Sequence, residues 1–173
     1  MRCVSFLTDG IKGTTWQGWV SLAARLVLGG ALLWAGAIKI GNLTQSVVAV
    51  RAYRLPLPDW LTSLIGHVMP FAEIVLGVAL ITGLFTRWVA AIGGLMMVAY
   101  IIGLSQAWAR GLNIDCGCFS PGGDLGAGQQ ADFLTPILRD TGLLILAVWL
   151  VLRPRAPWSV DAWIAGPEQD HAS

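Results

Sequence analysis

Residues 61–108 read LTSLIGHVMPFAEIVLGVALITGLFTRWVAAIGGLMMVAYIIGLSQAW, and this stretch decides the fold class. It holds two apolar runs, 61–83 and 86–108. A bilayer-spanning helix needs about 20 apolar residues to cross roughly 30 Å of hydrocarbon, and both runs meet that requirement. Lipid offers no hydrogen-bond partners, so the backbone of each run must be helical. The short connection between the runs predicts an antiparallel pair of membrane-spanning helices.

Two further apolar runs, 19–40 and 133–152, qualify as spans on the same grounds. The whole chain is 55% hydrophobic and only 12% charged, whereas a soluble domain carries about 25% charged residues. We therefore expect an all-α fold, an integral membrane four-helix bundle with the lipid bilayer as its surroundings. The net charge of +1 without a basic cluster argues against nucleic acid as a partner.

Aromatic and basic residues set the boundaries and the orientation of the spans. Amphipathic tryptophan rings favour headgroup depth, and eight of the nine tryptophans lie near span ends: Trp16, Trp19, Trp60, Trp88, Trp108, Trp149, Trp158 and Trp163. Short loops on the cytoplasmic side carry more Lys and Arg. One side has Arg2, Lys12, Arg87, Arg153 and Arg155, and the other has Arg51, Arg54 and Arg110, with Lys39 at a helix end. This bias predicts cytoplasmic termini.

The loop between the third and fourth spans contains the sequence NIDCGCFSPG at 113–122, with a C-x-C pair. The orientation places Cys116 and Cys118 outside the cytoplasm, where disulfides persist. Two Cα atoms two residues apart in an extended chain lie about 6.6–7.2 Å apart, near the upper limit for a disulfide. Gly117 allows the chain to bend between them. A strained, exposed disulfide is a labile one, so the pair is interpreted as a redox site.

Two alternatives to redox chemistry remain for this pair. A structural zinc needs about four ligands, and only Asp115 joins the two sulfurs, because Cys3 and His171 are predicted on the opposite side. We therefore expect no metal site. The other alternative is that the two thiols have no chemical role.

Ionisable residues within the spans indicate function or pairing, because charge is costly in lipid. At 1.5 Å per residue, Arg25 and Glu73 lie about 9 and 12 Å from the cytoplasmic edge. We expect these two residues to form a buried pair that fixes the register of the first two spans.

A second group, Lys39, His67 and Arg139, is expected near the outer face, beneath the cysteine loop. Cations there would stabilise a thiolate, or, with the histidine, would hold a quinone carbonyl. The alternative is that Lys39 extends to the interface and that Arg139 contacts Asp140. Pro70 should kink the second span and either open space below the loop or only shape the packing.

The combination of four motifs resembles the MauE/DoxX-like family of redox-associated membrane proteins over roughly residues 20–152. The motifs are RLVLGGALLWAGAIKI, RAYRLPLP, PFAEIVLG and NIDCGCFSPGG. Six positions match the family's polar and thiol positions: Arg25, Lys39, Glu73, Cys116, Cys118 and Arg139. The expected organisation is a cytoplasmic segment 1–18, a MauE/DoxX-like domain 19–152 and a cytoplasmic tail 153–173.

The resemblance implies a multi-pass protein of the bacterial inner membrane that assists oxidative maturation outside the cytoplasm. By resemblance, the partner is a thioredoxin-like protein and the client is the disulfide-rich small subunit of methylamine dehydrogenase. Cys116 and Cys118 would carry the thiol–disulfide exchange. Three alternatives stay open: a non-catalytic scaffold that docks a redox partner, a quinone-linked thiol oxidoreductase, and a transporter of a small ligand.

Overall fold

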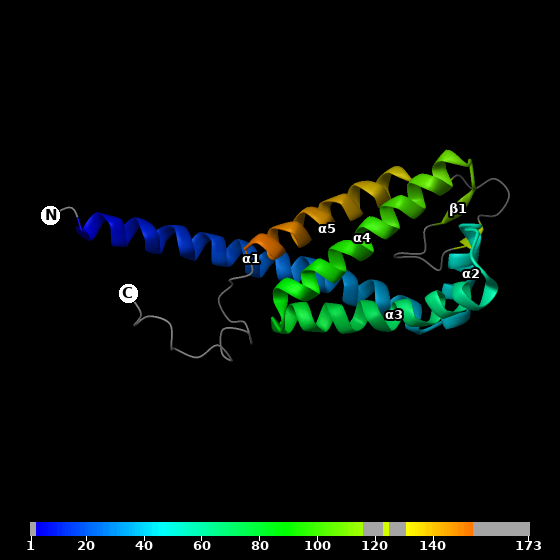
Figure 1. The fold of residues 1–173 in the computed structure, drawn as a ribbon, viewed down its shortest axis with the longest axis horizontal. Coiled ribbons are helices and arrows are strands. Elements are labelled where there is room, and N and C mark those ends of the chain that lie inside the picture. Colours follow the sequence, from blue (N-terminus) through cyan, green and yellow to red (C-terminus); the bar gives the residue numbers. More distant parts are fainter. Residues whose placement is uncertain (1–2, 116–122, 125–130, 154–173) are drawn as a thin grey trace.

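The protein is a bundle of long helices with a short helix and a small two-stranded sheet at one end (Figure 1). The computed structural model describes residues 3–115, 123–124 and 131–153, with 3–15 and 123–124 described by backbone alone. In chain order the elements are α1 (Cys3–Ile40), α2 (Leu43–Ala52), α3 (Asp59–Thr82), α4 (Thr86–Ala109), β1 (Ile114–Asp115), β2 (Gly123–Asp124) and α5 (Leu134–Leu152).

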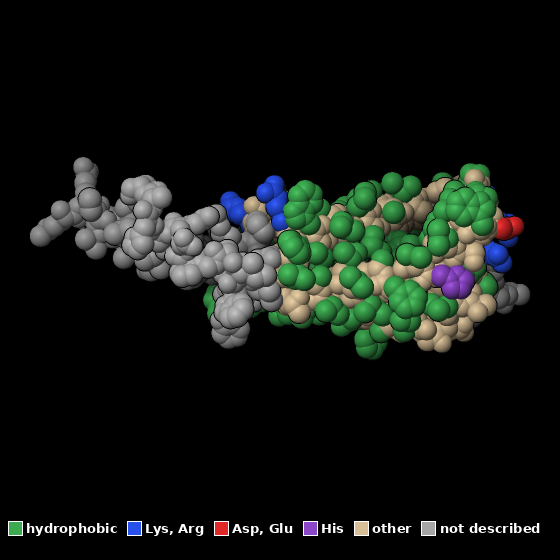
Figure 2. Space-filling view, turned by 60° about the horizontal axis from the view of Figure 1, so that its bottom comes forward, with side chains coloured by type: hydrophobic (Ala, Val, Ile, Leu, Met, Phe, Trp, Pro, Cys, Tyr) green, Lys and Arg blue, Asp and Glu red, His purple; other side chains and the backbone are tan. Residues whose placement is uncertain are grey.

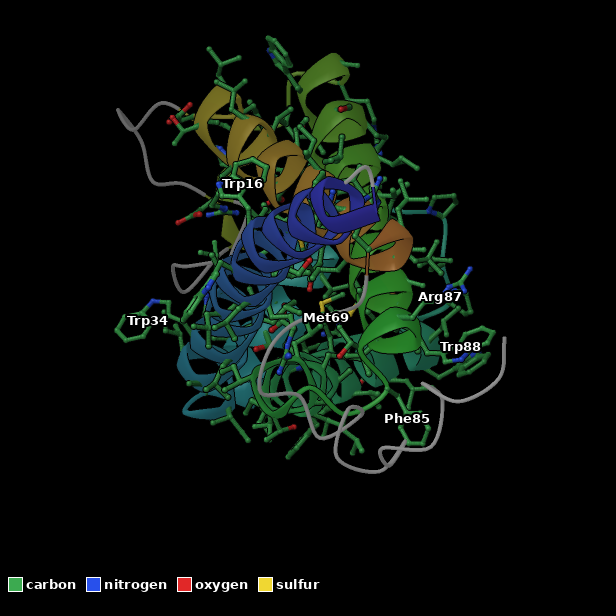
Figure 3. The ribbon with its side chains drawn as sticks, turned by 90° about the vertical axis from the view of Figure 1, so that its left-hand side faces the viewer. Trp16, Trp34, Met69, Phe85, Arg87 and Trp88 are labelled. Carbon is green, nitrogen blue, oxygen red and sulfur yellow. The ribbon has the colours of Figure 1, made fainter. Side chains whose placement is uncertain are left out.

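Four of these helices are long and apolar enough to cross a membrane. They cover Trp16–Ile40, Asp59–Thr82, Thr86–Ala109 and Leu134–Leu152, which confirms the four predicted spans to within three residues at each end. Apolar side chains cover the middle of the molecule and the basic side chains gather toward its two ends (Figure 2). Seen along the bundle, Trp34, Phe85 and Trp88 point outward, while Met69 lies among the helices (Figure 3). The fold is therefore that of a multi-pass helical membrane protein.

The helices associate as two close pairs, α1 with α3 and α4 with α5. Glycines bring α1 and α3 together: a Cβ on Gly36 would lie 2.7 Å from the Pro70 carbonyl oxygen, and one on Gly29 would lie 3.0 Å from that of Gly77. Small residues drive helix association in lipid because they let two backbones approach. These contacts fix the antiparallel register in which Gly36 lies opposite Pro70.

α3 and α4 are consecutive but make few contacts with each other. Gly83 ends α3 in the left-handed conformation (φ 75°), which glycine adopts without a Cβ penalty, and Phe85 precedes α4 with φ 48°. From this turn the two helices diverge along the bundle (Figure 1). We call this end, where the Gly83 turn and Arg153 lie, the terminal end, and the opposite end, which carries α2 and the strands, the loop end.

Hydrogen bonds close the terminal end between α1 and α5. Ser21 Oγ donates to the Arg153 carbonyl oxygen at 2.9 Å, and Trp149 Nε1 donates to Ser21 Oγ at 3.2 Å. Arg153 Nη1 donates to Gln17 Oε1 at 2.6 Å. The N-terminal part of the first span is thus hydrogen-bonded to the C-terminal end of the last span.

The loop end contains a helix that the sequence did not lead us to expect. α2 lies within the connection between the first two spans, and Asn42 Oδ1 accepts a hydrogen bond from the Gln45 amide at 3.2 Å at its start. Gly66 of α3 leaves room for it, because a Cβ there would lie 2.7 Å from the Val47 Cα. α2 therefore lies across the loop end of α3 and also contacts β2.

Candidate functional site

Three helices contribute to one buried polar cluster near the loop end. Lys39 of α1 forms a 2.6 Å ion pair with Glu73 Oε1 of α3, and the two side chains are 11% and 0% exposed. Tyr100 of α4 donates its hydroxyl hydrogen to the same carboxylate oxygen. The Lys39 ammonium also lies 5.5 Å from the centre of the Tyr100 ring, within cation–π range. The Tyr100–Glu73 hydrogen bond thus joins the otherwise divergent α3 and α4, and Lys39 adds α1 to the same cluster.

Side-chain direction explains why Lys39 and Glu73 meet. In a helix every Cα–Cβ bond tilts toward the N-terminus of that helix. Because α1 and α3 run antiparallel, Lys39 leans into the bundle and Glu73 leans toward the loop end. The two side chains therefore converge from positions that lie at different depths along their helices.

The predicted pair of Arg25 and Glu73 is wrong, since each residue has a different partner. The Arg25 Nε donates to the Leu80 carbonyl oxygen at 2.9 Å, and Nη2 donates to that of Ile81 at 3.1 Å. These carbonyl groups belong to the last turn of α3, which carries the negative end of the helix dipole. Carbonyl groups there lack the usual amide partner four residues on, although the Leu80 oxygen also accepts from the Gly83 amide at 3.1 Å. The tilt of α1 side chains points Arg25, like Lys39, toward the terminal end, and from the position of Arg25 this direction leads away from Glu73 and to the last turn of α3.

A second ion pair lies beside the cluster, on α5. Arg139 Nη2 is 2.9 Å from Asp140 Oδ1, with side chains 29% and 2% exposed, which is the contact that the sequence allowed for. A small void of about 10 Å³ touches Asp140 together with Glu73 and Tyr100. Among the described residues, Glu73 Oε2 and Asp140 Oδ2 are buried without a hydrogen-bond partner. The two carboxylates therefore face a space of about one water molecule.

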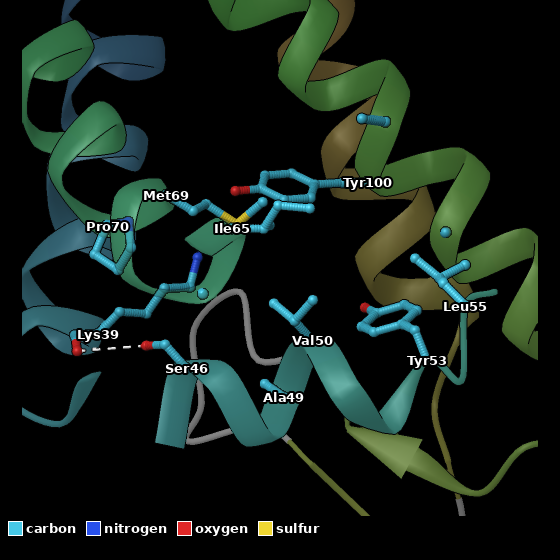
Figure 4. Close-up of a pocket in the computed structure, with 13 residues that line it drawn as sticks. Lys39, Ser46, Ala49, Val50, Tyr53, Leu55, Ile65, Met69, Pro70 and Tyr100 are labelled. Atoms are coloured by element: carbon cyan, nitrogen blue, oxygen red, sulfur yellow. Dashed lines mark hydrogen bonds between the residues drawn. The ribbon is translucent and has the colours of Figure 1, made fainter. Parts of the chain in front are cut away.

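A larger pocket of about 250 Å³ adjoins Lys39 on the side away from α5. α2, α3 and α4 form its walls, with apolar side chains such as Met69 and Val50 (Figure 4). The Lys39 ammonium points into the space between these walls, and the Tyr100 ring borders it. Pro70 also lines this pocket, so open space does lie beside it.

His67 does not belong to this site. It is exposed on α3, and its Nδ1 lies 2.8 Å from the Ser63 carbonyl oxygen of the preceding turn. Its side chain is therefore on the outer surface of the bundle. The structure therefore separates His67 from Lys39 and Arg139, with which the sequence analysis grouped it.

The two cations of that group are each held by a carboxylate, Lys39 by Glu73 and Arg139 by Asp140. Such pairing largely cancels the field of each cation at a neighbouring thiol. The stabilisation of a thiolate by these cations stays a prediction, and its expected size is smaller than for free charges.

Cys116 and Cys118 lie outside the described residues, but the chain on either side of them is described. β1 and β2 pair antiparallel, with Ile114 opposite Asp124 and Asp115 opposite Gly123. Ile114 is 2% exposed and belongs to a core cluster with Phe133. Residues 116–122 thus connect two paired strands at the loop end.

Side-chain hydrogen bonds hold the chain where it leaves this connection and enters α5. Asp132 Oδ1 accepts hydrogen bonds from the backbone amides of Leu134 at 3.1 Å and Thr135 at 3.2 Å. Hydrogen bonds from the Thr135 side chain and backbone lower the pKa of Asp132 below its usual range. Asn113 Oδ1 accepts from the Ala131 amide at 3.1 Å, which ties the two ends of the connection together.

Sequence reasoning missed Tyr100 and the whole of α2. It considered only ionisable residues within the spans, and Tyr100 is a neutral polar residue in the middle of one. A hydroxyl group in lipid also needs a partner, so this tyrosine was a usable signal. α2 is too short to register as a span, although Asn42 followed by an apolar segment is a helix-start signal.

The fold and the site define a class: a multi-pass helical membrane protein whose spans enclose a buried charge cluster and an apolar pocket below a small loop-end sheet. Comparison with protein families identifies the particular family. The chain belongs to the family of methylamine utilisation protein MauE, which matches residues 17–153. Comparisons with curated proteins and with solved structures gave no match.

Proposed function

We propose that the protein is a membrane thiol–disulfide factor that assists the oxidative maturation of proteins outside the cytoplasm. Its partner would be a thioredoxin-like protein, and Cys116 and Cys118 would carry the exchange. Membership of the MauE family supports methylamine utilisation, and within it methylamine dehydrogenase, as the setting. The protein would reside in the bacterial inner membrane with both termini in the cytoplasm.

The observation that carries this proposal is the anchoring of the chain around the C-x-C motif. β1 ends at Asp115, directly before Cys116, and β2 begins at Gly123, five positions after Cys118. Ile114 is buried in the core, and α2 contacts β2. A thiol pair between fixed strands at the end of a membrane bundle suits exchange with a protein partner rather than the stapling of a long loop.

The chemistry would be thiol–disulfide exchange. A thiolate of one protein attacks a disulfide sulfur of the other, forms a mixed disulfide and displaces a thiolate, and a second thiolate then resolves the mixed disulfide. One disulfide forms for each one that breaks, so two electrons pass between the partners. The displaced thiolates take up the protons that the attacking thiols release.

Trapping of the mixed disulfide tests the chemistry. In Cys118→Ala, Cys116 can still attack but Cys118 can no longer resolve the product, so a covalent adduct should accumulate in cells. Non-reducing electrophoresis and mass spectrometry then identify the attached protein. Cys3→Ala is the matched control, because it keeps the pair and should form no adduct.

An adduct at Cys116 with a thioredoxin-like protein is the expected result. A partner that co-purifies with Cys118→Ala without any covalent adduct would reject the exchange chemistry and favour the scaffold alternative. The orientation has its own test. Membrane-impermeant maleimide should label Cys116 and Cys118 from outside reduced, intact spheroplasts but not Cys3, and labelling of Cys3 alone would invert the topology.

A further inference from the structure

The pocket beside Lys39 has a position that suits a ligand from the lipid phase. It lies between α3 and α4, which diverge from their shared turn toward the loop end (Figure 1). Ala99 of α4 lines it and is itself exposed on the membrane-spanning part of the bundle. A ligand could therefore enter sideways, between two spans, without passing through water.

The size of the pocket limits what fits inside it. Its volume is about 250 Å³, and an engineered cavity of about 150 Å³ is enough for benzene. Pockets for larger ligands run from about 300 to 1,000 Å³. One substituted ring fits this space, while a long hydrocarbon tail would have to remain in the lipid.

The polar groups of the pocket select the chemistry of that ring. An ammonium group has three donors, and the structure shows one of them engaged, with Glu73 Oε1. The Lys39 ammonium faces the pocket (Figure 4), and the Tyr53 and Tyr100 rings contribute aromatic walls. The pocket thus offers the Lys39 donor in a space whose walls are mostly apolar, with the Ser46 and Tyr53 hydroxyl groups as the other polar groups of the described lining beside that of Tyr100.

Charge balance favours a neutral acceptor over an anion. The positive charge of Lys39 is matched by Glu73 at 2.6 Å, and that of Arg139 by Asp140 at 2.9 Å. A carboxylate ligand would meet no net positive charge and would lose its hydration in lipid. A carbonyl oxygen needs only the donor and loses little hydration.

We propose that the pocket between α2, α3 and α4 binds the head group of a lipid-soluble quinone, with a ring carbonyl accepting a hydrogen bond from Lys39. The ring lies between the tyrosine rings and Met69, and the isoprenoid tail leaves past Ala99. Tyr100 and Glu73 hold the ammonium in place, so they position the donor. Neither His67 nor Arg139 is among the described residues that line this pocket.

Binding of decylubiquinone to the full-length protein in nanodiscs tests this site. Ala99→Trp should fill the mouth of the pocket and weaken binding at least tenfold. Ala91→Trp is the matched control, because Ala91 is also exposed on α4 and is not among the described residues that line the pocket. Equal affinity of the two variants, at equal melting temperatures, would overturn the site.

The donor is tested with Lys39→Met combined with Glu73→Gln, which removes both charges together and leaves no unpaired ion. The double variant should bind decylubiquinone at least tenfold more weakly than the wild type. Decylbenzene, which has no carbonyl, should bind the wild type as weakly as decylubiquinone binds the double variant. Tighter binding of decanoate than of decylubiquinone would overturn the choice of a neutral ligand.

A variant with Cys116→Ser and Cys118→Ser separates this site from the proposed thiol chemistry. It should bind decylubiquinone as the wild type does, since the donor Lys39 and the described walls supply the contacts of the proposed site. Loss of binding in that variant would show that the ligand sits elsewhere. Failure of the Cys118→Ala trap leaves the quinone result unaffected.

Discussion

Replacement of Glu73 by Gln tests the charge cluster directly. Glu73 is fully buried and accepts from Lys39 at 2.6 Å. At an effective dielectric constant of about 20, two unit charges at that distance attract each other by roughly 6 kcal/mol before any desolvation cost. Removing one member of a buried pair costs about 3–5 kcal/mol, because the other charge loses its partner.

The structure places the expected loss at the lower end of that range. The Lys39 side chain remains 11% exposed near the loop end, so its charge can be partly relieved by solvent or headgroups. We expect Glu73→Gln to lower the free energy of unfolding by about 3 kcal/mol. Reversible unfolding in mixed dodecyl maltoside and dodecyl sulfate micelles, followed by circular dichroism, measures this loss.

A double-mutant cycle decides which residue is the partner. Lys39→Met with Glu73→Gln should cost at least about 2 kcal/mol less than the sum of the single variants, because the two residues are in contact. Arg25→Gln with Glu73→Gln should be additive within about 0.5 kcal/mol, since Leu80, which Arg25 contacts, lies about 10 Å from Glu73 along α3. Coupling in the second cycle and additivity in the first would refute the geometry described above.

Three further outcomes follow from the same structure. Tyr100→Phe should cost about 1.5 kcal/mol in the same unfolding assay, because Glu73 loses a hydrogen bond to a charged group; no loss would contradict that bond. Gly36→Ala should cost about 1–3 kcal/mol through overpacking against α3, whereas Gly30→Ala, with no atom within 4 Å of its Cβ, should be neutral or stabilising; equal effects would contradict the helix register. Hydrogen bonds lower the pKa of Asp132, so its contribution is present above the unfolded pKa and is lost as pH falls through the lower folded pKa. Asp132→Asn should remove that acid dependence below about pH 4, and an unchanged pH profile would assign it to other groups.

Much of the fold could be predicted because the spans depend on local sequence. A run of about 20 apolar residues has one stable arrangement in a bilayer, a helix across it. The four apolar runs therefore predicted the ends of the membrane-spanning helices to within three residues. The connection 41–58 could not be resolved in this way, because a ten-residue helix such as α2 is marginal alone and gains its stability from α3 and β2.

The polar residues were found from the sequence, but their partners were not. Arg25 and Glu73 were matched on the assumption that all spans begin and end at the membrane edge. In the structure α1 ends at Ile40 beside the second turn of α3, because Gly36 lies opposite Pro70 and α2 crosses above at Gly66. That offset brings Lys39 within reach of Glu73 and leaves Arg25 at the last turn of α3.

The sequence by itself determined that this chain has four helices long and apolar enough to cross a membrane, because the transfer of apolar surface from water to lipid depends on composition and length. It also showed which charged residues lie within the four apolar runs, and that the two thiols lie between the third and fourth runs. Only the tertiary structure decided which charges meet and where a pocket opens. Those features depend on how glycine contacts set the register of α1 on α3, and on the divergence of α3 from α4. Side chains from helices that are distant in sequence are thereby brought to the same depth, and no local sequence pattern predicts which side chains will meet.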